Sequence, residues 1–159
     1  MKNFPGFEFI IACSEEEFSA GENLFNEYSK SIKIDLSFQN FENDLKEISK
    51  QYNKPEGGIV LIKHNLEFIG CAGIRKFKDN IAELKRMYIK PDYQGLGLGK
   101  QLLKIAILLA KELNYSKIYL DTLSSMKSAV KIYKAAGFKK IKPYRFNPSE
   151  EALFFEKVI

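Results

Sequence analysis

Apolar and polar residues along the first third of the chain follow the period of a strand and then the period of a helix. Residues 7–12 are predicted to form a first strand. Ser14 and Glu17 have the spacing of a capping box, which predicts that a helix begins directly after Ser14. Apolar residues at helical spacing over 37–52 predict a second helix, which the proline and glycines of 55–58 end.

The rest of the chain continues with strands and helices in turn. A hairpin is predicted from 58–63 and 67–74 with its turn at His64 and Asn65, followed by a strand over 81–90 that ends at Pro91. An amphipathic helix over 100–113 and a strand over 117–123 come next. A helix over 124–137 has Ser124 or Ser125 as its N-cap and Gly137 as its stop, and the closing strands lie within 138–144 and 151–159. The order β-α-α-β-β-β-α-β-α-β-β predicts a single α/β domain over 1–159, with mixed parallel and antiparallel pairing.

The composition argues against a membrane protein, a secreted protein and a metal-binding protein. The longest apolar run, residues 105–110, is too short to cross a membrane, and the first residues lack the features of a signal peptide. Cys13 and Cys71 lie in apolar, strand-like contexts, so we expect buried free thiols and a cytoplasmic location. No second ligand lies near His64 in sequence, so no metal site is expected.

The net charge of +5 suggests an anionic partner. The lysines are scattered along the sequence, and no basic run is interleaved with aromatic residues. Nucleic-acid binding is therefore unlikely on this pattern, whereas a bound phosphate ligand explains the same excess of charge.

The stretch DYQGLGLGK at residues 92–100 is the strongest chemical signal. A P-loop requires glycine where Gln94 stands and a hydroxyl where Gln101 stands, so that motif fails. The dinucleotide motif GxGxxG fails from either starting glycine. Two interpretations remain: a backbone cradle for a pyrophosphate at the start of a helix, or a tight turn without a ligand.

Two motifs together resemble a known family. The pattern Q-x-x-G-x-G of Gln94, Gly97 and Gly99 resembles the coenzyme A motif of the GNAT superfamily of acetyl-coenzyme A-dependent N-acyltransferases. Residues 129–138 resemble the family signature A-x-x-x-Y-x-x-x-G-F. Met126 departs from it, because many members carry asparagine there. The resemblance implies a mixed, mostly antiparallel central sheet flanked by helices.

The resemblance also implies roles at the donor side. The residues implied in cofactor binding are Met87, Tyr88, Ile89, Gln94, Gly95, Leu96, Gly97, Leu98, Gly99, Lys100, Met126, Ala129 and Tyr133. Tyr133 is the implied proton donor to the departing thiolate. Glu83 is the implied general base, with a pKa raised by a partly dry cleft. The alternative is a surface glutamate that pairs with Lys85 or another lysine. Asp121 is the alternative base or an anchor for the acceptor amine.

The acceptor side is less defined by sequence. Arg75, Arg86 and Arg145 are candidates to hold a carboxylate or phosphate, and Tyr28 and Tyr144 are candidates to line a pocket. The expected activity is direct transfer of acetyl from acetyl-coenzyme A to a primary amine of a small molecule, amino acid or peptide in a ternary complex. The alternative is a non-catalytic acyl-coenzyme A-binding or regulatory module, and a homodimer is possible.

Overall fold

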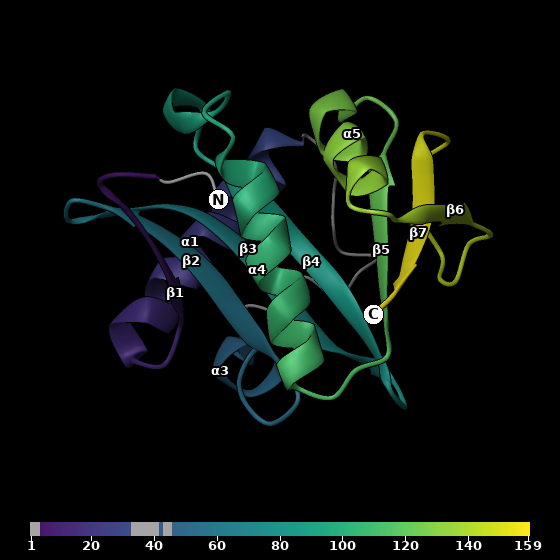
Figure 1. Ribbon diagram of the computed structural model, residues 1–159, viewed down its shortest axis with the longest axis horizontal. Helices are drawn as coiled ribbons and strands as arrows, with labels where there is room; N and C mark the ends of the chain where they lie inside the picture. The colour runs from purple at the N-terminus through teal and green to yellow at the C-terminus, as the bar shows by residue number, and fades with distance from the viewer. Residues whose placement is uncertain (1–3, 33–41, 43–45) are drawn as a thin grey trace.

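The computed structural model describes residues 4–32, 42 and 46–159 (Figure 1). Its elements are β1 (Phe7–Ile11), α1 (Glu15–Ser31), α3 (Ile48–Gln51), β2 (Gly58–His64), β3 (Glu67–Lys78), β4 (Ile81–Ile89), the 3-10 turn η2 (Pro91–Tyr93), α4 (Leu98–Glu112), β5 (Lys117–Leu123), α5 (Lys127–Ala135), β6 (Lys139–Ile141) and β7 (Ala152–Val158). This order confirms the predicted one. Most of the predicted helix over 37–52 lies outside the described residues.

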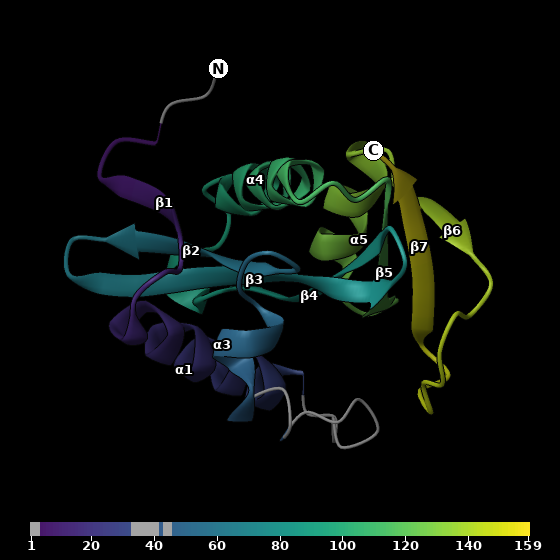
Figure 2. The same cartoon turned by 90° about the horizontal axis from the view of Figure 1, so that it is seen from below.

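The seven strands form one sheet in the order β1-β2-β3-β4-β5-β7-β6. Every neighbouring pair is antiparallel except β4 and β5. Figure 2 shows the layers, with α4 and α5 on one face of the sheet and α1 and α3 on the other. One buried core lies under α4 and α5 and a second under α1 and α3, as the mixed α/β prediction requires.

Helix α1 begins as the sequence predicts. The Glu17 amide donates to Ser14 Oγ at 3.2 Å, and the Ser14 amide donates to Glu17 Oε2 at 3.1 Å. Cys13, just before this box, is exposed, so the prediction of a buried thiol was wrong for this residue. The chain leaves the sheet at Ile11, and Cys13 therefore no longer has a strand's buried face.

Helices α4 and α5 start at other residues than predicted. Helix α4 begins at Leu98, inside the glycine stretch. Helix α5 begins at Lys127 with Met126 as its N-cap and without a capping side chain, so the prediction of a serine cap was wrong. Its end is as predicted: Gly137 has φ of +93°, and the Phe138 amide donates to the Tyr133 carbonyl at 3.1 Å.

Two irregularities of β4 position the site. Its register against β3 shifts between Cys71 and Gly73, opposite Arg86, which has φ of +57°. This bulge puts Tyr88 in the core under α1, on the same side of the sheet as Glu83. In addition, β4 pairs with β5 only over Ile81–Glu83, so the strands separate beyond that point.

None of the helices in the described part of the chain is long and apolar enough to cross a membrane.

Candidate active site

A cavity of about 640 Å³ opens where β4 and β5 separate. Most residues implied in cofactor binding line it: Met87, Tyr88, Ile89, Gln94, Gly95, Gly97, Leu98, Gly99, Lys100, Met126 and Ala129. Tyr28 and Ser31 from the end of α1 complete the wall, together with Ile132 of α5. Leu96 and Tyr133 are absent from this lining. The fold thus gathers segments that lie 100 residues apart in the sequence around one cavity.

The glycines of residues 95–99 serve different purposes. Gly95 and Gly97 have φ of +81° and +85°, a left-handed conformation that side chains other than glycine rarely adopt. Gly99 lies inside the first turn of α4, where an added Cβ would come within 3.2 Å of Ile132 Cδ1. Two glycines therefore set the loop conformation, and the third lets α5 pack closely against α4.

The N-terminus of α4 has the features of an anion-binding site. Gly97 is its N-cap, so no side chain caps the helix, and its first turn contains no acidic residue. The first amides of a helix lack intrahelical partners and carry the positive end of the helix dipole. With Lys100 beside them, these groups fit a pyrophosphate in the adjoining cavity.

Gln94 has a structural role in this loop. Its side-chain amide donates to the Ile89 carbonyl at 2.8 Å, and its backbone amide donates to the Pro91 carbonyl at 3.2 Å. These bonds fasten the start of the glycine loop to the end of β4. The glutamine of the motif therefore fixes the distance between the strand that borders the cavity and the helix that opens it.

Tyr133 is buried behind the cavity wall, with only 6% of its surface exposed. Its ring packs on Phe138 at 5.9 Å and on Phe155 at 6.5 Å between centroids. Burial, with the nearby Tyr28 and the charge of Asp121, raises the pKa of Tyr133 well above its usual range. The phenol is therefore neutral near pH 7, and its raised pKa makes it a weaker acid than an exposed tyrosine.

Glu83 is fully buried and bound on all sides. The Tyr144 hydroxyl donates to its Oε2 at 2.7 Å, and Arg145 Nη2 and Arg75 Nη2 donate to its Oε1 at 3.0 and 3.2 Å. Burial opposes ionisation of Glu83, but the charges of Lys85, Arg145 and Arg75 outweigh it and lower the pKa. The expected raised pKa is not found, because the cleft around Glu83 is filled by cations.

Lys85 is buried, whereas the sequence offered it only as the partner of a surface Glu83. Its Nζ lies 4.0 Å from Glu83 Oε2 and 3.9 Å from Asp121 Oδ1. Burial lowers the pKa of Lys85 to about 7, although Glu83 and Asp121 oppose the shift. The sequence indicates this proximity, because Lys85 follows Glu83 by two residues and side chains two apart on a strand lie on the same face.

Four of the six candidate acceptor residues form a connected cluster: Arg75, Asp121, Tyr144 and Arg145. Arg75, Tyr144 and Arg145 meet at Glu83, and a cavity of about 330 Å³ adjoins both arginines. Lys85 links this group to Asp121, which also accepts a hydrogen bond from Asn147 Nδ2 at 3.1 Å. Tyr28 instead lines the coenzyme cavity, where its ring packs on that of Tyr88 at 6.4 Å between centroids. Arg75 of β3, Asp121 of β5, and Tyr144 and Arg145 of the loop between β6 and β7 therefore lie in one region.

Neither cysteine is an activated nucleophile. Cys71 is buried, its Sγ donates to the Arg86 carbonyl at 3.2 Å, and burial raises the pKa of its thiol. Cys13 lies at the start of α1, outside the linings of both cavities, and Glu17 raises its pKa. Over residues 4–32, 42 and 46–159, no group of three metal-ligating side chains occurs.

Comparisons with known proteins agree with this geometry. The model of the acetyltransferase (GNAT) family matches residues 21–138. An N-acetyltransferase of Schizosaccharomyces pombe is 35% identical over 134 residues, which cover 82% of each chain. The N-acetylaspartate synthetase of Danio rerio is 30% identical over 119 residues, 72% of this chain and 42% of that protein.

Solved structures show the same fold. A GNAT acetyltransferase of Staphylococcus aureus superposes with a TM-score of 0.78 at 27% identity, over 96% of this chain and 98% of that one. An acetyltransferase of Streptococcus agalactiae superposes with a TM-score of 0.79 at 22% identity, over 98% and 100% of the two chains.

Proposed function

Because this chain belongs to the GNAT family of acetyltransferases and transfers acetyl from acetyl-coenzyme A, we propose that its acceptor is a small amine that carries a carboxylate. The observation that carries the proposal is the arginine pair of Arg75 and Arg145 beside the 330 Å³ cavity. An arginine fork binds a carboxylate through two parallel hydrogen bonds.

The Arg145 guanidinium can donate a further hydrogen bond. Its Nη2 donates to Glu83, whereas its Nε is buried and has no hydrogen-bond partner among the described residues. A buried donor without a partner costs stability, and a carboxylate in the adjoining cavity would remove that cost. Glu83 then acts as a positioning residue that holds both guanidinium groups in place.

The relatives support the same class of acceptor. The proteins that share 26–30% identity with this chain include the N-acetylaspartate synthetases of Danio rerio and Xenopus tropicalis, which are named for an acetylated amino acid with two carboxylates. Each extends well beyond the matched region, because the match covers 42% and 49% of their lengths.

Direct attack of the amine on the thioester fits the residues present. Neither cysteine is suited to carry an acyl group, as described above. Asp121 lies on the part of β5 that β4 does not pair, 3.9 Å from Lys85 Nζ, so we place it ahead of Glu83 as the acceptor of the amine proton. Tyr133 supplies the proton to the leaving thiolate.

A thiol-release assay tests the proposal with matched acceptors: L-aspartate and L-glutamate against their diamides, which keep the α-amine and carry no carboxylate. We expect the acids to be preferred, and Arg145→Ala to raise KM for the acid at least about tenfold with KM for acetyl-coenzyme A unchanged. Equal use of acids and amides would contradict the carboxylate assignment and leave the acetyltransfer intact. Absence of thiol release with any amine would contradict the activity itself.

Two further expectations belong to this proposal. Two free thiols in the described chain favour a reducing compartment, which supports a cytoplasmic location. A homodimer stays a prediction that sedimentation of the purified chain tests.

A further inference from the structure

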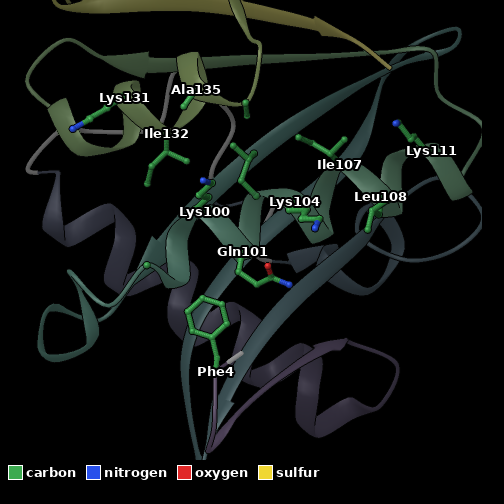
Figure 3. A pocket seen from close by; sticks show the side chains of 13 residues that line it. Phe4, Lys100, Gln101, Lys104, Ile107, Leu108, Lys111, Lys131, Ile132 and Ala135 are labelled. Carbon is green, nitrogen blue, oxygen red and sulfur yellow. The ribbon is translucent and has the colours of Figure 1, made fainter. Parts of the chain in front are cut away.

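We propose that the groove between the outer faces of α4 and α5 is a docking site for an acidic, amphipathic segment of a partner protein. The groove has a volume of about 760 Å³ and lies on the face of the sheet opposite α1 (Figures 2 and 3). It meets the coenzyme cavity at Gly97, Lys100 and Ile132 and continues along α4 to Lys111.

The charge of the groove is of one sign. Lys100, Lys104 and Lys111 of α4 and Lys131 of α5 line it, and no acidic side chain does so in the described part of the chain (Figure 3). Lys100 also borders the coenzyme cavity, so the row left for a partner along α4 runs from Lys104 to Lys111, about 10 Å at 1.5 Å per residue. One small anion would contact only a part of this row, whereas an extended acidic segment matches its length.

The space between the lysines is apolar. The remaining lining is mainly Phe4, Leu103, Ile107, Leu108, Ile132, Ala135 and Ala136. Leu108 is 48% exposed and adds a large apolar side chain to this lining. An amphipathic helix with acidic flanks presents the complementary pattern, with apolar residues at i, i+3, i+4 and i+7.

Other anionic partners fit this groove less well. Single-stranded nucleic acid uses several aromatic platforms and arginine, and Phe4 is the one aromatic residue among the described residues of this lining. A lipid surface is flat on this scale and does not reach the floor between two helices. An acidic protein segment satisfies both the charge and the concave apolar floor.

The experiment uses the full chain with saturating acetyl-coenzyme A, so that an empty pyrophosphate site cannot bind the probe. The probe is a fluorescein-labelled 14-residue peptide with leucines at i, i+3, i+4 and i+7 and glutamates elsewhere. A scrambled peptide of the same composition is the control. By fluorescence anisotropy at physiological salt, we expect the patterned peptide to bind about tenfold more tightly than the scrambled one.

The variants test the location. Lys111→Glu and Leu108→Ser lie away from the coenzyme cavity, and we expect each to weaken binding of the patterned peptide about tenfold while acetyl transfer persists. Lys134→Glu is the matched control, because Lys134 is exposed on α5 but does not line the groove. Its effect should stay within about twofold.

Several results would overturn the proposal. Equal binding of both peptides would mean attraction by charge alone, and no binding at millimolar peptide would mean no site. Tighter binding of a uridine oligonucleotide or of vesicles with anionic lipid at the same salt would assign the groove to another partner. Self-association that Lys111→Glu weakens would assign it to a second copy, whose α1 begins with three glutamates.

Discussion

At the scale of single residues, the most unusual feature is the cluster of charges inside the protein. Lys85 and Glu83 are both buried, and Asp121 lies 3.9 Å from the amine. Burial favours the neutral amine, whereas the two carboxylates favour the ammonium, and the pKa of Lys85 comes to about 7. The cluster therefore changes its charge near neutral pH, where the enzyme's acceptor must also lose a proton.

This balance predicts a pH-dependent stability. An unfolded lysine has a pKa near 10.4, so between pH 7 and that value the unfolded state binds more protons than the folded state. The free energy of unfolding should therefore rise with pH above 7, by up to about 1.4 kcal/mol per pH unit. Below pH 7 both states are protonated, and this contribution stays constant.

The measurement is urea unfolding of the wild type and Lys85→Met at pH 6, 7.5 and 9. The difference in unfolding free energy, wild type minus variant, should grow from pH 7.5 to pH 9. Lys134→Met removes an exposed amine and should give parallel curves. Parallel curves for Lys85→Met as well would show that its pKa is ordinary.

Tyr133 gives a second prediction at this scale. Tyr133→Phe removes the hydroxyl and keeps the ring contacts with Phe138 and Phe155, so kcat should fall about a hundredfold with KM for acetyl-coenzyme A little changed. Tyr115→Phe is the control, since its hydroxyl donates to the Glu56 carbonyl at 2.6 Å, remote from the coenzyme cavity. An unchanged kcat in Tyr133→Phe would remove the proton-donor role.

At the scale of elements, the start of α4 joins a strand end to an anion site. Gln94 fixes the loop to Ile89, and two left-handed glycines turn the chain so that α4 begins without a capping side chain. A helix of this length would usually gain stability from a side-chain cap. Its absence leaves the first amides available to a ligand.

Gly97→Ala tests this interpretation. A Cβ at φ of +85° costs about 1–2 kcal/mol, and the shifted backbone no longer presents its amides correctly, so affinity for acetyl-coenzyme A should fall at least about tenfold. Gly137→Ala places the same strain at the end of α5 and should lower the melting temperature alone. Calorimetric titration of both variants gives the affinities, and equal losses in the two would show a general effect of instability.

Element order was predictable from sequence because periodicity and caps are local. The capping box of α1 and the stop at Gly137 depend on residues within a few positions of each other. The partners of Glu83 from outside its own strand were not predictable in the same way. They are Arg75, Tyr144 and Arg145, which only the folded sheet brings to one point.

At the scale of the whole molecule, four lysines of α4 and α5 lie along one groove: Lys100, Lys104, Lys111 and Lys131. The first and last of these lysines are 31 residues apart in the sequence, and in the described part of the chain no acidic side chain lines the same groove. The sequence suggested an anionic partner from the net charge but not a surface. Charge placement is a property of the fold, because helix periodicity decides which lysines share a face.

The sheet itself consists of two parts joined weakly at β4 and β5. Their pairing extends only over Ile81–Glu83 and Lys117–Tyr119, and the coenzyme cavity lies where the strands separate. A ligand that contacts both parts should therefore stabilise the molecule as a whole. At 100 times its dissociation constant, acetyl-coenzyme A should add about 2.7 kcal/mol, which corresponds to roughly 5–10 °C in melting temperature.

Hydrogen exchange locates this effect. With acetyl-coenzyme A bound, protection should increase at the ends of β4 and β5 beyond the paired residues and at the start of α4, because these segments border the cavity. ATP carries phosphates but no pantetheine, so it should protect the start of α4 without protecting the strand ends. Equal protection by both ligands would mean that the pyrophosphate alone is bound and that the separation of the two strands is not where the acyl donor lies.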